Sequence, residues 1–231
     1  MSSNCRQCII KRFNALKTLT PEELEKFSDH KTSIVIKKGD NLMTEGNSIN
    51  GLYCIKDGKG KMTKLNTNGK EQIIKFIKGG DILGHRSILS DELVGLNAIA
   101  LEDMEVCFIP KTEIMGFFDK NNQFSMNVMK TICGDLKEAD LHSVNMAQKT
   151  VKERLAETLL YLSDTFGKNE DNSLKIKLSR EELASLIGTA TESCIRLLSE
   201  FNKLGMIELN GKKIVLKKPL KKKYLACLIM L

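Results

Sequence analysis

The hydrophobic pattern of the chain changes near residue 122. Before that point, short apolar or alternating runs are separated by glycine-containing turns, which is typical of an antiparallel β-sandwich or barrel. The runs are SIVI (33–36), GLYCI (51–55), KMTKL (61–65), EQIIKFI (71–77), LNAIAL (96–101) and MEVCFI (104–109). Asn68-Gly69 predicts a hairpin between two of them, because both residues tolerate positive φ. Thr20-Pro21 marks the start of a short helix ahead of the strands.

From Asn122 onwards the apolar positions recur every three or four residues, which predicts one long helix that continues to about Thr150. A helix of this length cannot bury its whole surface inside a domain of this size. We therefore expect it to bridge two domains or to pair with a second copy of itself through an apolar stripe. The predicted stripe contains Phe124, Val128, Ile132 and Leu136.

Residues 149–167 predict a further amphipathic helix, and a pair of short helices follows a polar loop. The first, within 177–188, carries a capping box in which Ser179 caps and Glu182 reaches back, and Gly188 ends it. We expect a second capping box from Thr189 to Glu192 to start the next helix. Its predicted core face is Cys194, Ile195, Leu198 and Phe201. Two short helices joined by a glycine-containing turn predict a helix-turn-helix.

Residues 206–218 then predict a β-hairpin hinged on Asn210-Gly211, which would complete a winged helix-turn-helix. Eight lysines and one acid lie between Lys203 and Lys223, an excess of seven that equals the formal charge of +7 of all 231 residues. Such a basic region suits a polyanion.

The second helix of the pair has the chemistry of a DNA-reading element. Its N-terminal half enters the major groove in proteins of this architecture. There, glutamate accepts a hydrogen bond from cytosine, and arginine donates two to guanine. Glu192 and Arg196 are also spaced i, i+4 and could simply pair with each other. The residues expected at DNA are Ser179, Thr189, Thr191, Glu192, Ser193, Arg196, Lys212 and Lys213.

Other functional classes find less support. The chain contains no GxxxxGKS/T phosphate loop, and its three histidines, His30, His85 and His142, are widely spread. We therefore expect no enzyme. Neither a membrane-spanning run nor a secretory signal is evident, so we expect a cytoplasmic protein without membrane contact.

With these motifs in place, the chain resembles the CRP/FNR family of bacterial transcription regulators over nearly its whole length. The segments that carry the resemblance are SREELASLIGTATESCIRLLSEFNKLGMIELNGKKIVL, KKGDNLMTEG, GLYCIKDGKGK, GKEQIIKFIKGGDILG and EVCFIP. The resemblance implies base-reading roles for Glu192 and Arg196, a homodimer on a roughly palindromic site, and RNA polymerase as a partner. Position 191 is threonine where catabolite activators carry arginine, so the operator need not be theirs.

The resemblance also predicts an effector pocket in the first half, formed by Gly84, His85, Arg86, Ser87, Val94 and Gly95. In cyclic-AMP-binding members, a glutamate and an Arg-Ser pair hold the ligand. Here His85 replaces the glutamate, and Val94-Gly95 stand where Arg-Ser is expected. Without that arginine a buried cyclic phosphate would lack a countercharge, which argues against cyclic AMP.

Another branch of the family senses oxygen through an iron–sulfur cluster held by four thiolates. Cys5, Cys8 and Cys107 stand where three of the ligands would be, and Asn14 occupies the remaining N-terminal position. The cofactor stays open between such a cluster, an unidentified small ligand and no effector.

We therefore predict an α+β protein with an N-terminal antiparallel, jelly-roll-like β-roll (1–121), a long dimerisation helix (122–149) and a C-terminal winged helix-turn-helix (150–231). The expected function is sequence-specific, regulated DNA binding. The alternative is a cyclic-nucleotide-type module that regulates a partner protein.

Overall fold

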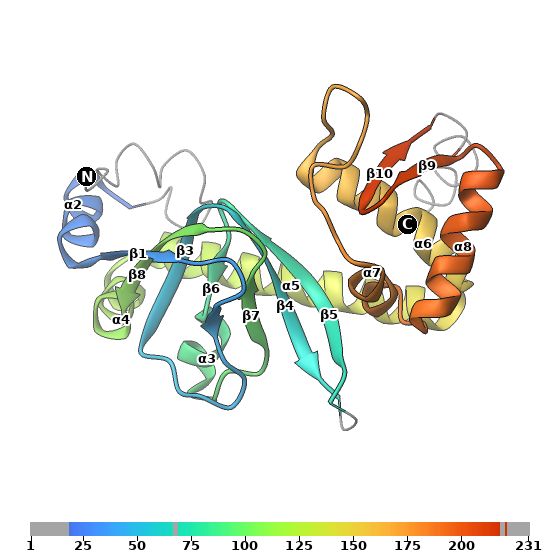
Figure 1. Ribbon diagram of the computed structural model, residues 1–231. Helices are drawn as coiled ribbons and strands as arrows, with labels where there is room; N and C mark the ends of the chain where they lie inside the picture. Colours follow the sequence, from blue (N-terminus) through green and yellow to red (C-terminus); the bar gives the residue numbers. More distant parts are fainter. Residues whose placement is uncertain (1–18, 67–68, 218–219, 221–231) are drawn as a thin grey trace. The chain divides into compact units, whose positions relative to one another are not determined.

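Two antiparallel four-stranded sheets form the first part of the chain in the computed structural model, which describes residues 19–66, 69–217 and 220 (Figure 1). The first sheet has the strand order β1 (Thr32–Ile36), β8 (Met104–Pro110), β3 (Gly51–Asp57), β6 (Ile82–Leu83). The second has the order β2 (Asn41–Met43), β7 (Asn97–Ala100), β4 (Lys59–Leu65), β5 (Glu71–Lys78). All six predicted strands are confirmed, whereas β2 and β6 are too short to leave a periodic signal.

The strands alternate between two hydrophobic cores. Ile55 and Val106 of the first sheet pack with Met62, Ile77 and Ala98 of the second, so one core lies between the sheets. Since consecutive strand residues point to opposite faces, their neighbours Cys54 and Cys107 face away from that core. The first sheet is thus covered on both faces.

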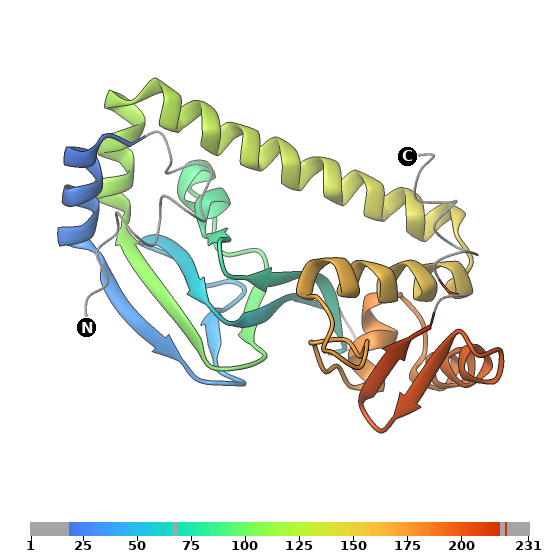
Figure 2. The same cartoon turned by 90° about the horizontal axis from the view of Figure 1, so that it is seen from above.

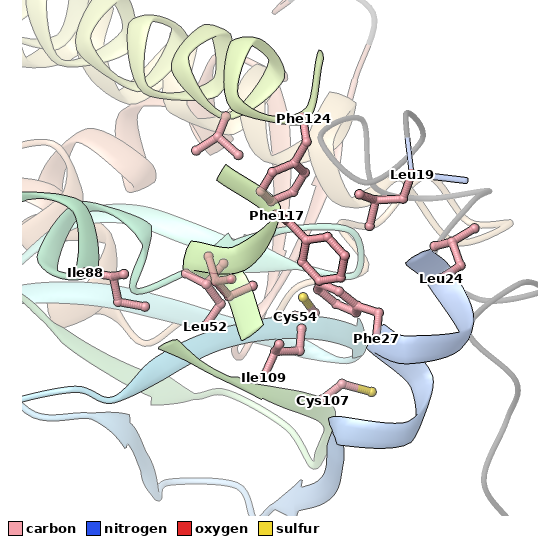
Figure 3. Packing of buried hydrophobic residues seen from close by; sticks show 12 residues of the cluster. Leu19, Leu24, Phe27, Leu52, Cys54, Ile88, Cys107, Ile109, Phe117 and Phe124 are labelled. Atoms are coloured by element: carbon pink, nitrogen blue, oxygen red, sulfur yellow. The ribbon is translucent and has the colours of Figure 1, made fainter. Parts of the chain in front are cut away.

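Helices cover the outer face of the first sheet. They are α2 (Pro21–His30), α3 (His85–Ser90), α4 (Lys111–Lys120) and the start of α5 (Asn122–Gln148). Figure 3 shows Phe27, Phe117 and Phe124, one from each of α2, α4 and α5, gathered over Cys54 and Cys107. The Phe27 and Phe117 ring centroids lie 5.5 Å apart, and those of Phe117 and Phe124 lie 6.1 Å apart. Three sequence-distant segments therefore share one core.

The predicted long helix is present as α5, but the predicted dimer stripe needs correction. Phe124 and Val128 are only 1% and 5% exposed, because their side chains fill the core of their own chain. Ile132 is half-buried against the same core, and of the four only Leu136 is exposed, at 62%. The predicted stripe, chosen by its i, i+4 spacing, therefore coincides mostly with the face of α5 that packs against its own chain.

The chain divides into two compact units, residues 1–138 and 139–231, and α5 contributes to both. The second unit contains the end of α5, α6 (Val151–Phe166), α7 (Arg180–Leu186), α8 (Thr191–Lys203), β9 (Ile207–Asn210) and β10 (Lys213–Leu216). The two antiparallel strands, red in Figure 2, form the predicted hairpin. Its turn is Gly211-Lys212, with Gly211 at φ +59°, one residue beyond the predicted Asn210-Gly211, because Asn210 still pairs with Lys213 in the ladder. In the described part of the chain, no helix is long and apolar enough to cross a bilayer.

Candidate nucleic-acid interface and sensory site

Hydrogen bonds define both ends of α7, the first helix of the helix-turn-helix. Ser179 caps α7 as predicted: its Oγ accepts from the Glu182 backbone N–H (3.0 Å), while Glu182 Oε2 accepts from the Ser179 N–H (2.8 Å). Gly188 follows the helix at φ +63°, and its N–H donates to the Ser185 carbonyl. The Thr189 N–H donates to the Ala184 carbonyl and completes a Schellman-type ending.

The second predicted capping box is wrong. The N-cap of α8 is Ala190, which has no side chain able to cap, and the helix begins at Thr191. The reason lies in the preceding helix: the Thr189 backbone is used to close α7 and therefore cannot also adopt the N-cap position of α8. Thr189 is half-buried in the turn itself.

Helix α8 separates a buried face from an exposed one. Cys194, Leu198 and Phe201 are buried at i, i+4 and i+7. Ile195, which we predicted in that core, is 46% exposed. One residue corresponds to about 100° around a helix, so Ile195 lies on the side of Glu192 and Arg196 instead.

The exposed face of α8 carries the residues predicted to read bases. Glu192 and Arg196 are exposed, and Thr191 and Ser193 are half-buried. Neither Glu192 nor Arg196 forms an ion pair within residues 19–66, 69–217 and 220, so both heads face outward. Ile195 adds an exposed apolar side chain to this face, which a helical wheel centred on Cys194 and Leu198 would have revealed from the sequence.

The hairpin beside α8 carries charged pairs. Lys213 pairs with Asp171 of the preceding loop, and hydrogen bonds from Lys213 and Ser173 hold the pKa of Asp171 well below its usual range. Lys217 Nζ lies 2.7 Å from Glu208 Oε2. Lys212 is exposed at the turn. A phosphate would meet Lys212 directly, whereas it would have to compete with Asp171 for Lys213. The lysines at 218 and 221–223 lie outside the described residues.

Of the six predicted effector-pocket residues, His85 lines a cavity beside α5, and the grouping of all six in one pocket stays a prediction. Val94 is buried in the core between the sheets, and Arg86 and Gly95 are exposed. The buried Ser87 hydroxyl donates to the Leu93 carbonyl (3.4 Å). Gly84 has φ +91°, and a Cβ there would lie 3.0 Å from the Gly51 carbonyl oxygen, so the backbone itself favours glycine at this position.

His85 is the member of that set that reaches the long helix. Its Nε2 lies 3.3 Å from Asp135 Oδ2, and Lys75 Nζ donates to Asp135 Oδ1 at 2.9 Å. His85 Nδ1 lies 3.2 Å from the Ile82 carbonyl oxygen. Since both ring nitrogens face acceptors, only the protonated ring donates to both.

Asp135 is the sensory-side residue that sequence reasoning missed. Burial alone would raise its pKa, but hydrogen bonds from His85 and Lys75 outweigh burial and lower the pKa from 3.8 to about 2. Lys75, His85 and Asp135 line a cavity of about 280 Å³ together with Lys78, Gly79, Gly80, Asp81, Ile82, Leu83 and Thr131. No local sequence signal joins Asp135 to this cavity, because the contact links segments 60 residues apart.

The predicted thiolate ligands are only partly described. Cys107 is buried on β8, directly opposite Cys54 on β3. Cys5 and Cys8 lie outside the described residues. Within the described residues, no group of three or more histidine, cysteine, aspartate or glutamate side chains could hold a metal ion. The described part thus offers Cys107 but not a four-thiolate set, and the cluster stays a prediction.

Comparisons with known proteins agree with this architecture. A family model described as the cyclic nucleotide-binding domain matches residues 33–121, and one described as the Crp-like helix-turn-helix domain matches residues 153–221. The fumarate and nitrate reduction regulatory protein of Escherichia coli K12 is 28% identical over 216 residues, which cover 92% of this chain and 86% of that protein.

Solved structures share the fold. FixK2 from Bradyrhizobium japonicum has a TM-score of 0.72 at 23% identity, covering 83% of this chain and 96% of FixK2. The c-di-GMP responsive regulator CLP from Xanthomonas campestris has a TM-score of 0.75 at 18% identity, covering 85% and 99% of the two chains. With a cyclic-nucleotide-type roll followed by a Crp-like helix-turn-helix, the chain belongs to the CRP/FNR family of DNA-binding transcription regulators.

Proposed function

We propose that the chain acts as a homodimer that reads a palindromic operator with the exposed face of α8. The observation that carries this proposal is the outward position of Glu192, Ile195 and Arg196 at the N-terminal half of that helix. Arginine recognises guanine O6 and N7, glutamate accepts from cytosine N4, and an aliphatic side chain suits the thymine methyl group.

Supporting roles fall to the residues around α8. Thr189, Thr191 and Ser193 lie in or beside the turn, where hydroxyl groups can donate to phosphates. Ser179 already accepts a hydrogen bond as a helix cap, but its hydroxyl proton remains a donor. Lys212 and Lys213 of the hairpin supply charge to the DNA backbone.

The dimer rests on a different face of α5 from the one that fills the core. Met126, Met129, Cys133 and Leu136 are exposed and follow one another at spacings of three, four and three residues. This is the a/d spacing of a two-helix seam. A second α5 packed along it would bury these side chains, while Phe124 and Val128 hold each helix to its own roll.

The base-reading role can be tested by selecting duplexes from a random pool with the wild-type protein. The Arg196→Ala variant should lose preference at one base pair in each half-site, because only one bidentate contact is removed. Lys203→Ala, at the C-terminal end of the same helix, is the matched control and should select the wild-type sequence. An unchanged preference in Arg196→Ala would contradict the assignment.

The dimer seam can be tested by sedimentation of two charge variants. Leu136→Glu places a carboxylate on the proposed seam and should shift the protein toward monomer. Lys137→Glu introduces the same group one residue further around the exposed helix surface and should stay dimeric. Equal behaviour of the two variants would place the contact elsewhere.

The regulatory signal is proposed to act at the cavity beside α5, since His85 and Asp135 connect the roll to the long helix there. Neither Val94 nor Gly95 offers a cation for a cyclic phosphate, so the proposed signal is not cyclic AMP. The setting would be the cytoplasm, with RNA polymerase as the protein partner and without catalysis. A module that only regulates another protein would show no sequence preference in the selection.

A further inference from the structure

The guanidinium of Arg154, near the start of α6, donates to four backbone carbonyls. Nη1 donates to the carbonyls of Lys149 (2.8 Å) and Met146 (3.2 Å). Nε donates to the Ile187 carbonyl (2.8 Å), and Nη2 donates to the Gly188 carbonyl (3.3 Å). Two of the acceptors belong to the end of α5, and two belong to the end of α7 and its turn.

Met146 lies in the last turn of α5, and the other three acceptors follow directly after α5 or α7, where helix-end carbonyls lack an intrahelical partner. The C-terminal ends of α5 and α7 also carry partial negative charge, which a fixed cation stabilises. The planar fork of arginine can address several such oxygens at once, whereas lysine offers a single point charge. Arg154 therefore links the two helix ends in a way that lysine cannot reproduce.

A second contact joins the same two segments. A Cβ built on Gly188 would lie 2.3 Å from Met146 Cε, so the turn sits directly against the last turns of α5. Gly188 is also the residue at φ +63° from which the chain turns toward α8, three positions before that helix begins. The direction of α8 thus depends on where this turn is held.

We propose that Arg154 is a positioning residue for operator binding, because it fixes the turn before α8 to the end of α5. The inference rests on the proposed function, in which two α5 helices pair across the dimer axis. To read half-sites about one helical repeat apart, each copy of α8 has to be held in a fixed orientation, and Arg154 supplies this by holding the turn to the end of α5. Arg154 would accordingly set the half-site spacing without touching DNA.

The test measures affinity as a function of half-site spacing. The probes are the best duplex selected by the wild-type protein and versions with one or two base pairs added to or removed from its centre. Wild type should prefer its own spacing by at least ~10-fold, since a displaced half-site forfeits base contacts. Arg154→Lys should reduce that preference to less than ~3-fold while leaving the preferred half-site sequence unchanged.

Arg180→Lys is the matched control. Arg180 Nη2 donates to the Gly211 carbonyl (2.7 Å) and connects α7 to the hairpin rather than to α5. Its substitution should change affinity by the same factor at every spacing. Met146→Ala provides an independent variant at the Arg154 junction, and it should also flatten the spacing preference.

Two results would overturn the inference: a spacing preference in Arg154→Lys as sharp as in wild type, or a uniform loss of affinity at all spacings. A uniform loss would mean that Arg154 merely stabilises the domain. If wild type itself selects no two-fold symmetric site, the proposed homodimer function fails, and the inference fails with it.

Discussion

The DNA-binding half and the sensory half build their sites from residues at very different separations. In the helix-turn-helix, the capping pair Ser179 and Glu182 is three residues apart, and the exposed residues of α8 lie within two turns of one helix. In the roll, Lys75 meets Asp135 across 60 residues, and Phe27 of α2 and Phe124 of α5 both pack near Phe117 of α4. The residues of a site on one helix can be recognised from their spacing in the sequence. Residues that only tertiary packing brings together cannot be recognised in this way.

The largest expected effect tests the inward face of α5. Phe124→Ala should lower the free energy of unfolding by about 3–5 kcal/mol, because it leaves a cavity in a core shared with Phe27 and Phe117. Glu138→Ala, at an exposed position of α5 outside the proposed seam, should change the free energy of unfolding by less than about 0.5 kcal/mol. Urea unfolding followed by circular dichroism measures both. Similar losses of unfolding free energy in the two variants would contradict the distinction between the core-packed and exposed faces of α5.

The next effect concerns the outward face of α8. Arg196→Ala should cost about 1–3 kcal/mol of binding free energy at its cognate base pair. Lys212→Ala should weaken binding to every duplex by a similar factor and reduce the salt slope by about one. Titrations on the selected duplex and on a scrambled one separate these two patterns. A uniform effect of Arg196→Ala would remove this residue from the base-reading set.

The helix caps offer a sharper comparison within the turn. Ser179→Ala should destabilise the protein by about 1 kcal/mol, since it removes an observed cap. Thr189→Ala should cost only a few tenths of a kcal/mol in unfolding free energy, because its side chain caps no helix. Thermal unfolding of the two variants measures both losses. A larger loss of unfolding free energy in Thr189→Ala than in Ser179→Ala would show that the Thr189 side chain caps α8 after all.

The smallest effect concerns Asp135 and pH. Its folded-state pKa of about 2 lies below the ordinary value of 3.8, so its pairing with His85 and Lys75 stabilises the protein above pH ~4. That contribution is lost as pH falls from about 4 toward 2. Because the side chain is about a third exposed, we expect it to be worth less than about 1 kcal/mol.

Comparing Asp135→Asn with wild type across this range measures the contribution. The difference between their unfolding free energies should shrink as the pH falls. A constant difference for Asp135→Asn would show that its ion pairs do not change on unfolding.

These results explain which parts of the molecule could be predicted from sequence. Six strands, the long helix and the winged helix-turn-helix follow from short-range periodicity, glycine turns and capping residues. Ile195 and the dimer stripe were misassigned because an apolar residue on a helix does not itself reveal which side is covered. Helix α5 has two apolar faces, and residue spacing alone does not show which of them packs against the roll.

The residues of the proposed sensory site could be recognised only from the fold. Val94 and Gly84 lie near His85 in sequence, yet Val94 fills a core and Gly84 shapes a turn. Asp135 completes the site from α5, and its sequence neighbours carry no pattern that points to β5 or α3. The periodicity of the sequence does not predict a long-range ion pair of this kind.

The most direct measurement is equilibrium binding of the selected duplex and a scrambled duplex of equal length between about 50 and 200 mM salt. We predict that affinity for both duplexes falls by orders of magnitude over this range, because several phosphates are neutralised. The selected duplex should remain bound at least ~10³-fold more tightly throughout, since base contacts do not depend on released counterions. Equal affinity for the two duplexes, or no measurable binding to either, would contradict the assignment of α8 as a sequence-reading helix.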